Sequence, residues 1–423
     1  MHVIRTFYLL AMNKILKISK LFIVSVGLMA FGCNDDSVDS RPDPVRPVVI
    51  PERISAGTND FAFDFFKNLQ QVENSDKNLF VSPLSLHIAL GMLLNGAENE
   101  TASEILKTLK MEGVSQADLN NAYKTLLNDM PAADSKVTLG LANSVWYRNT
   151  VQVETDFKNV LNQSFNAEIT GLEFNKAALD KINQWASDKT NGKIKKVLDE
   201  IKEDEVMFLL NALHFKGDWT TKFDAKNTLD QTFHLQTGTD KKVKMMYAKS
   251  DFALSGSEKY TAVKLPYGNG QFEMTVLLPR DQNSITEILN SFTSAQWSKI
   301  KSDTAKIGIN LGLPRFTLEY SKRLNDALKS MGMPKAFSDL AEFGKMIKTM
   351  PIKVGFVKQD TYLGIDEKGT EAAAVTTIAM VELSANPKEP QNVIFDRPFG
   401  IIISEKTSNT ILFMGRIMNP DSK

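Results

Sequence analysis

The chain has 423 residues, of which 43% are hydrophobic and 24% are charged, so it can bury a large core. Its 50 lysines and arginines balance its 50 aspartates and glutamates, and this neutrality gives no indication of a nucleic-acid partner. The single cysteine and the four scattered histidines lack the spacing of a disulfide framework or a metal site. We therefore expect neither a metal ion nor a cofactor.

Residues 1–32 have the pattern of a signal peptide for export. A basic region precedes an apolar run at residues 21–32, which has the length of a signal core but is short for a membrane span. Ala30 and Gly32 are small residues before Cys33, so the junction resembles that of a bacterial lipoprotein, although leucine is more usual at position 30. An ordinary signal peptide with an incidental cysteine is the alternative, and Met12 is a candidate start.

Residues 33–54 are acidic and then proline-rich, which is typical of a flexible tether that leaves a membrane anchor. The residues directly after Cys33 resemble the acidic tags of surface lipoproteins in Bacteroidetes-type bacteria. We expect a lipid on Cys33, attachment to the outer membrane and exposure at the cell surface, with extracellular release as the alternative.

Residues 55–423 have the pattern of one continuous domain without an internal repeat, and its first half is mainly helical. Asn59 is a plausible cap of the first helix, and Ser82 followed by Pro83 begins the second. His87 and His214 lie in apolar runs and are expected to be core residues rather than ligands. The expected helices cover residues 59–72, 82–97, 98–109, 115–130, 154–165 and 179–194.

Strands dominate the second half, although one arrives early. The expected strands cover residues 136–148, 205–219, 231–236, 242–255, 260–268, 272–279, 306–320, 352–366, 391–405 and 410–420. Helices followed by strands, without a domain boundary, predict one large α+β domain.

No group of residues is arranged for catalysis. The sequence has no G-x-S-x-G motif and no P-loop, and the glycines at positions 268 and 270 lie between two expected strands, as in a hairpin turn. The carboxylates at positions 203–205 precede a strand and are most simply a solvated face. We therefore predict that the chain is not an enzyme.

Residues 367–390 are unusual for a segment near the end of a folded domain. They are too apolar for a solvated loop and too poor in large side chains for a core element. Residues 364–377 resemble the hinge of the reactive loop of serpins, which are serine protease inhibitors. The run found in inhibitory members is matched by Glu367, Lys368, Gly369, Thr370, Glu371, Ala372, Ala373 and Ala374.

The resemblance to serpins covers about residues 55–420. Further landmarks of the family are matched in order by residues 78–97, 182–194, 208–223, 265–279, 313–338 and 396–420. The resemblance implies the serpin fold, with three β-sheets, eight to nine helices and an exposed reactive-centre loop at about residues 367–392. It also implies that a protease cleaves this loop, which then enters the largest sheet as a new strand and carries the acylated protease with it.

The loop residues suit such an insertion, because a central strand alternates its side chains between two faces. Thr370 and the even-numbered residues after it to Met380 form one face without a charge, whereas Glu371 lies on the other and can face water. Gly369 supplies a conformational pivot, and no proline interrupts residues 368–386. An Ala/Thr-rich exposed loop without a second state is the plain alternative.

The resemblance also assigns residues that hold the sheet where it opens. Ser82, Ser85 and Asn211 match positions of this latch, and Trp219 matches the tryptophan beneath the point of loop entry. A histidine is usual in the latch, but this chain has Gln359, which can both donate and accept a hydrogen bond.

Counting along the family pattern from Glu367 predicts Leu383-Ser384 as the bond that the protease cleaves. Met380 and Lys388 are the alternative positions for this cleavage. Leucine suits proteases with an apolar primary pocket. The resemblance therefore implies a monomeric, irreversible suicide-substrate inhibitor of chymotrypsin-, elastase- or subtilisin-like serine endopeptidases, and also of cysteine proteases. A non-inhibitory serpin that binds a partner at the cell surface is the main alternative, and a surface hydrolase or glycan-binding lipoprotein is the third.

Overall fold

The computed structural model describes residues 44–370 and 389–421. The chain divides into residues 1–42 and 43–423, and every helix and strand described belongs to the second unit. Cys33 and the expected signal region lie outside the described residues. Within the ranges described, no helix is long and apolar enough to cross a membrane.

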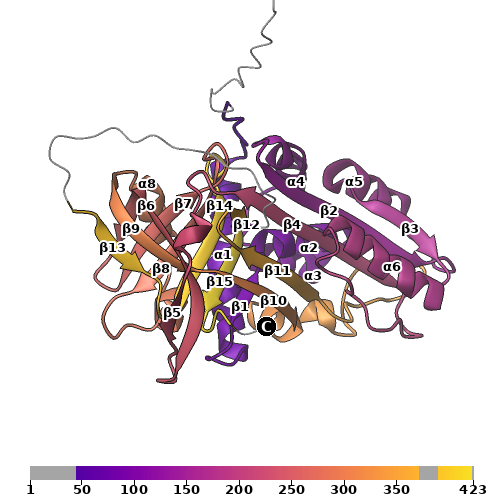
Figure 1. The fold of residues 1–423 in the computed structure, drawn as a ribbon. Coiled ribbons are helices and arrows are strands. Elements are labelled where there is room, and N and C mark those ends of the chain that lie inside the picture. The colour runs from indigo at the N-terminus through magenta and orange to yellow at the C-terminus, as the bar shows by residue number, and fades with distance from the viewer. Residues whose placement is uncertain (1–43, 371–388, 422–423) are drawn as a thin grey trace, which may run out of the picture. The chain divides into compact units, whose positions relative to one another are not determined.

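Nine α-helices are present in this part of the chain (Figure 1). They are α1 (Glu52–Val72), α2 (Pro83–Gly96), α3 (Asn99–Thr108), α4 (Gln116–Asp129), α5 (Thr155–Phe165), α6 (Lys176–Lys189), α7 (Ile285–Asn290), α8 (Ser294–Ser302) and α9 (Asn325–Ser330). The cap predicted for α2 is present, because the Ser82 side chain accepts a hydrogen bond from the amide of Ser85.

Asn59 was predicted wrongly as a helix cap. α1 begins seven residues earlier, at Glu52, so Asn59 lies inside the helix. Its side chain instead donates to the carbonyl of Asn409 at 2.7 Å and accepts from the amide of Ile411 at 3.2 Å. Asparagine is a good cap because it bonds to free backbone groups, and here those groups belong to a distant turn.

The expected tether also ends earlier than residue 54. Val48 is fully buried, and its amide donates to the Thr407 hydroxyl at 2.8 Å. The amide of Arg46 donates to the Gln271 side chain at 3.1 Å. The residues from about position 46 onward are therefore part of the folded domain.

The strands of the domain include several that the sequence pattern divided differently. They are β1 (Leu79–Val81), β2 (Val137–Arg148), β3 (Glu168–Leu172), β4 (Met207–Asp218), β5 (Leu229–His234), β6 (Asp240–Gly256), β7 (Tyr260–Pro266), β8 (Phe272–Pro279), β9 (Lys306–Pro314), β10 (Phe316–Arg323), β11 (Lys358–Ile365), β12 (Gly369–Thr370), β13 (Gln391–Ile394), β14 (Phe399–Glu405) and β15 (Thr410–Ile417). The expected strand at 306–320 is divided at Arg315 into β9 and β10, which belong to different sheets.

The strands form the three sheets expected of the fold. One has six strands in the order β10-β11-β12-β4-β2-β3. The other two are joined by the 17-residue β6, whose first part pairs with β5, whose middle pairs with β9 and whose end pairs with β7. The strand order β1-β15-β14-β8-β7-β6-β9-β13 therefore passes through both.

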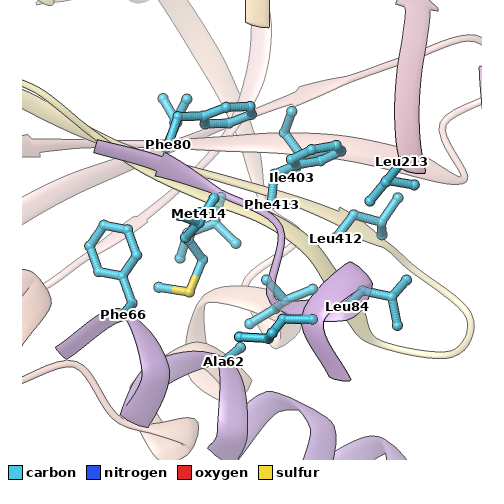
Figure 2. Close-up of a cluster of buried hydrophobic side chains, with 14 of the residues drawn as sticks. Ala62, Phe66, Phe80, Leu84, Leu213, Ile403, Leu412, Phe413 and Met414 are labelled. Atoms are coloured by element: carbon cyan, nitrogen blue, oxygen red, sulfur yellow. The ribbon is translucent and has the colours of Figure 1, made fainter. Parts of the chain in front are cut away.

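The main core lies where α1 and α2 meet β15 and the inner face of β4. Figure 2 shows Ala62 and Phe66 from α1, Leu84 from α2 and Leu213 from β4 in this cluster. Phe80 stacks on Phe413 with ring centroids 5.0 Å apart. On the opposite face of the six-stranded sheet, α6 packs through Ile182 and Trp185. Both faces of β4 are thus covered, which makes the sheet suitable for holding a further central strand.

Candidate functional site

The hinge already occupies a strand position in the six-stranded sheet. Thr370 pairs with Gly217 of β4 on one side and with Ile365 of β11 on the other, in both cases antiparallel. Its side chain is 2% exposed, and its hydroxyl lies 2.8 Å from that of the buried Tyr267. We expected entry into the sheet only after cleavage, but in the uncleaved chain the first residue is already inserted.

Gly369 is required by a close approach of two backbones. A Cβ atom at this position would collide with the carbonyl oxygen of Gly217 and would lie 2.8 Å from the Cα atom of Asp218. No other residue type fits this space without moving β4. Glycine thus lets β12 begin directly beside the end of β4.

Trp219 holds the turn that leads into β12. Its amide donates to the carbonyl of Lys368 at 2.8 Å, and its indole nitrogen donates to the carbonyl of Asp366 at 2.9 Å. The ring stacks on Tyr267 at a centroid distance of 4.4 Å and an interplanar angle of 15°. One aromatic pair therefore supports both the turn and the inserted Thr370.

Glu367 is anchored rather than free. Its carboxylate accepts a hydrogen bond from Thr228 at 2.8 Å and pairs with Arg315 at 3.3 Å, while its carbonyl accepts from the amide of Phe223 at 2.9 Å. Only 9% of the residue is exposed. These bonds fix the start of the hinge, so bending has to occur beyond this point.

Two of the expected latch residues, Ser82 and Ser85, lie at the first turn of α2. They contact the other two, which lie on the strands that flank the hinge. Gln359 of β11 accepts from the amide of Ser82 at 2.9 Å and donates to the carbonyl of Ser82, also at 2.9 Å. The Ser82 hydroxyl donates to the carbonyl of Leu412 at 2.8 Å. Glutamine can therefore make both hydrogen bonds from β11 to the backbone of this turn.

The other half of the latch joins α2 to β4. The hydroxyl of Ser85 donates to the Asn211 side-chain oxygen, and the Asn211 amide donates to Asn143 of β2 at 2.6 Å. Asn143 in turn donates to the carbonyl of Phe165 at 2.7 Å. The same helical turn thus binds β11 through Ser82 and β4 through Ser85.

In the described part of the chain, β12 joins β4 to β11 only over a short stretch. β12 has two residues, whereas β4 has 12 and β11 has eight. Among the described residues, β4 and β11 form no ladder with each other. A strand that extended β12 further between β4 and β11 would have to pass the latch.

Several predicted residues cannot be placed. Glu371, Ala372, Ala373 and Ala374, the bond Leu383-Ser384, and the alternatives Met380 and Lys388 all lie outside the described residues. Sequence reasoning missed Tyr267, Thr228, Arg315 and Asn143, which contact the expected residues across long stretches of chain. Within the described ranges, no group of three or more His, Cys, Asp or Glu residues could hold a metal ion.

Comparison with known proteins identifies the family to which this arrangement belongs. A family model for the serpins, the serine protease inhibitors, matches residues 56–420. The chain is therefore a member of the serpin family, a family of protease inhibitors and not of enzymes.

Relatives and solved structures agree with this assignment. The leukocyte elastase inhibitor of Bos taurus is 32% identical over 382 residues, which cover 87% of this chain and 100% of the relative. An uncharacterised serpin-like protein of Methanosarcina acetivorans is 29% identical over 410 residues, which cover 95% and 96%. The thermophilic serpin Tengpin in its native state has a TM-score of 0.80 at 29% identity, covering 90% of this chain and 97% of its own.

Members with other roles have the same fold. Human thyroxine-binding globulin, crystallised in complex with thyroxine, has a TM-score of 0.79 at 26% identity and covers 87% of this chain and 99% of its own. The same fold thus occurs in inhibitors and in binding proteins. The choice between these two roles for this chain has to be argued from its own residues.

Proposed function

We propose that this serpin is an irreversible suicide-substrate inhibitor of serine endopeptidases of the chymotrypsin, elastase or subtilisin type, with cysteine proteases as a second class of target. The observation that supports the proposal is the position of Thr370 between β4 and β11. A hinge that has already entered the sheet lets the rest of the loop follow residue by residue. No bulky or charged side chain stands among Ala372, Ala373 and Ala374 to stop it.

The proposed reaction begins as an ordinary proteolysis. The protease serine attacks the carbonyl carbon of Leu383, the amide bond to Ser384 breaks, and the amine of Ser384 leaves with the C-terminal segment. Leu383 remains bound to the protease as an ester. Insertion of the loop between β4 and β11 then moves the protease away from the loop's original position and deforms its active site before water can hydrolyse the ester.

Insertion can supply the energy for this displacement. Each new backbone hydrogen bond contributes about 0.5–1.5 kcal/mol net, so a dozen inserted residues release on the order of 10 kcal/mol before the entropy of ordering is subtracted. The uncleaved fold is then a kinetic trap whose barrier includes the latch.

The decisive experiment mixes the purified domain with chymotrypsin and looks for a complex that survives boiling in SDS. A covalent band, together with a released C-terminal fragment that begins at Ser384, supports the proposal. A fragment that begins at Val381 or Glu389 would instead place the cleaved bond after Met380 or Lys388. Cleavage without any stable complex would favour a non-inhibitory binding protein.

We also propose that the inhibitor acts as a monomer, lipid-anchored through Cys33 to the outer membrane and exposed at the cell surface. The pattern of basic, apolar and small residues before Cys33 supports this location. Cys33→Ala should move the protein from the membrane fraction to the soluble fraction, because the anchoring acyl chain contributes about 0.8 kcal/mol per buried CH₂. Retention of the variant in the membrane fraction with unchanged mass would contradict the anchor.

A further inference from the structure

A cationic pocket lies on the outer face of the six-stranded sheet, directly beside the inserted hinge. Its volume is about 730 Å³, and Lys193, Lys216, Arg315 and Tyr362 are among the residues that line it. Figure 1 labels β4 and β11, the two strands with which β12 pairs. Lys216 belongs to β4 and Tyr362 to β11, so residues of both strands line the pocket. Lys193 follows α6, and its ammonium lies 4.5 Å from the centre of the Tyr362 ring.

The acidic groups near this pocket are already engaged elsewhere. Asp366 also lines the pocket, but its carboxylate accepts hydrogen bonds from the amides of Lys368 at 2.8 Å and Gly369 at 3.2 Å. Glu367 neutralises Arg315. Asp218, the nearest carboxylate along β4, pairs with Lys222 at 3.0 Å. Among the described residues, no ion pair involves Lys216. Lys216 therefore provides positive charge in the pocket for a carboxylate that comes from outside the described residues.

The register of β12 determines which residue arrives there. Thr370 pairs with Gly217 and Ile365, so one further antiparallel step during insertion would place residue 371 opposite Lys216 and Gly364. Side chains alternate along a strand, and the Thr370 side chain points inward to Tyr267. In this register, residue 371 of the inserted loop would point outward, to the face that carries the pocket.

We infer that this pocket is the receptor for the carboxylate of Glu371 as the loop inserts, with Lys216 and Lys193 as positioning residues for the second inserted position. Opposite charges that face each other directly across a ladder stabilise the pair. Gly364 on the other side has no side chain, and the hydroxyl of Tyr362 lies over it. The inference rests on the proposed function, because it concerns the insertion that traps the protease.

The pocket gives insertion a direction as well as stability. Once Glu371 is bound, withdrawal of the hinge requires the ion pair to be broken, while the next residues on the inward face are small. Lys216 and Lys193 would thus commit the loop to insertion after its first step and would raise the share of encounters that end in a trapped protease.

The test uses Lys216→Ala, Lys193→Ala and Glu371→Gln in the whole chain, with Lys195→Ala as the matched control because Lys195 is exposed and does not line the pocket. Two quantities are measured: the number of inhibitor molecules consumed per chymotrypsin molecule trapped, and the rise in Tm on cleavage of the loop. We expect each pocket variant to consume about two to five times more inhibitor, as for loss of one partly exposed ion pair, and to show a smaller Tm rise.

Coupling distinguishes an ion pair from independent effects. Lys216→Ala combined with Glu371→Gln should lose no more than either single variant, and the exchange Lys216→Glu with Glu371→Lys should recover part of the loss. The effects should also shrink in 1 M salt, where exposed charges are screened. If the wild type traps chymotrypsin but the pocket variants behave like Lys195→Ala, or the losses simply add, the inference is wrong. If the wild type traps nothing, the proposed function itself fails.

Discussion

Replacing Thr370 with arginine would test whether the inserted hinge is the start of the trapping step. Thr370 is 2% exposed, and its nearest polar partner is the Tyr267 hydroxyl at 2.8 Å, which carries no charge. Burial of a guanidinium there costs several kcal/mol, and even ~3 kcal/mol moves an equilibrium by more than 100-fold.

The uncleaved variant can avoid this cost, but the inserted state cannot. β12 has only two residues, so its release from the sheet loses a few ladder hydrogen bonds of about 1 kcal/mol each. We therefore expect Thr370→Arg to fold with its hinge outside the sheet and a slightly lower Tm. After cleavage, the whole loop would have to enter behind the arginine, so insertion should stop at its first residue.

The assay compares cleavage, trapping and thermal stability. Thr370→Arg should be cut by chymotrypsin at the same bond and at a similar rate, without a complex that survives SDS. The cleaved wild type should melt far above the uncleaved form, whereas the cleaved variant should gain much less. Thr370→Val is the matched control, because it keeps the shape and loses only the hydroxyl. If Thr370→Arg forms the SDS-stable complex with chymotrypsin as efficiently as the wild type does, insertion through β12 is refuted.

Three further predictions concern specificity, the latch and pH. Leu383→Arg should shift inhibition from chymotrypsin-like to trypsin-like proteases, because only an acidic primary pocket pairs with a guanidinium; association rates with both enzymes measure the shift, and unchanged selectivity would place the bond elsewhere. Gln359→Ala should leave the buried amide of Ser82 without a partner, at about 1–3 kcal/mol, while the Ser82 carbonyl keeps its hydrogen bond from the Leu86 amide. The variant should therefore lose inhibitory activity faster during warm incubation, and an unchanged half-life would remove Gln359 from the latch. Burial lowers the pKa of His87 to about 4, so the folded state binds fewer protons than the unfolded state, and stability should be complete above pH 6.5 and fall as the pH drops toward 4. Urea unfolding should show about 3 kcal/mol of this loss, and His87→Gln should show a smaller pH dependence.

The sequence pattern predicted the long helices and strands because their signals are local. The cap at Ser82 and the proline after it are adjacent in the chain, and the structure has both as expected. The same reasoning missed β1, with three residues, and β3, with five, because strands this short carry too little periodicity. It also predicted one continuous strand across Arg315, where the chain in fact passes from one sheet to another.

For the site, the resemblance to serpins predicted the roles of single residues but not the contacts between them. The pairing of Thr370 with Tyr267 joins residues 103 positions apart, and the bonds of Gln359 to Ser82 join residues 277 apart. Such contacts depend on how the sheets meet, which no local pattern encodes. The early entry of the hinge was therefore unexpected, although the small side chain of Thr370 and the glycine before it make it feasible.

The register of β12 connects the hinge, the pocket and the latch in one order of events. If the loop inserts as proposed, six antiparallel steps beyond the pairing of Thr370 with Gly217 and Ile365 would bring residue 376 opposite Asn211 on β4 and Gln359 on β11. Both halves of the latch would then meet the inserting strand at the same level. Residue 376 would share the inward face with Thr370, and it is a threonine, whose hydroxyl could bond to groups that Ser82 and Ser85 release. On the proposed mechanism, the first residues would therefore enter before the latch opposes insertion, and the loop would bring its own hydrogen-bonding group to that barrier.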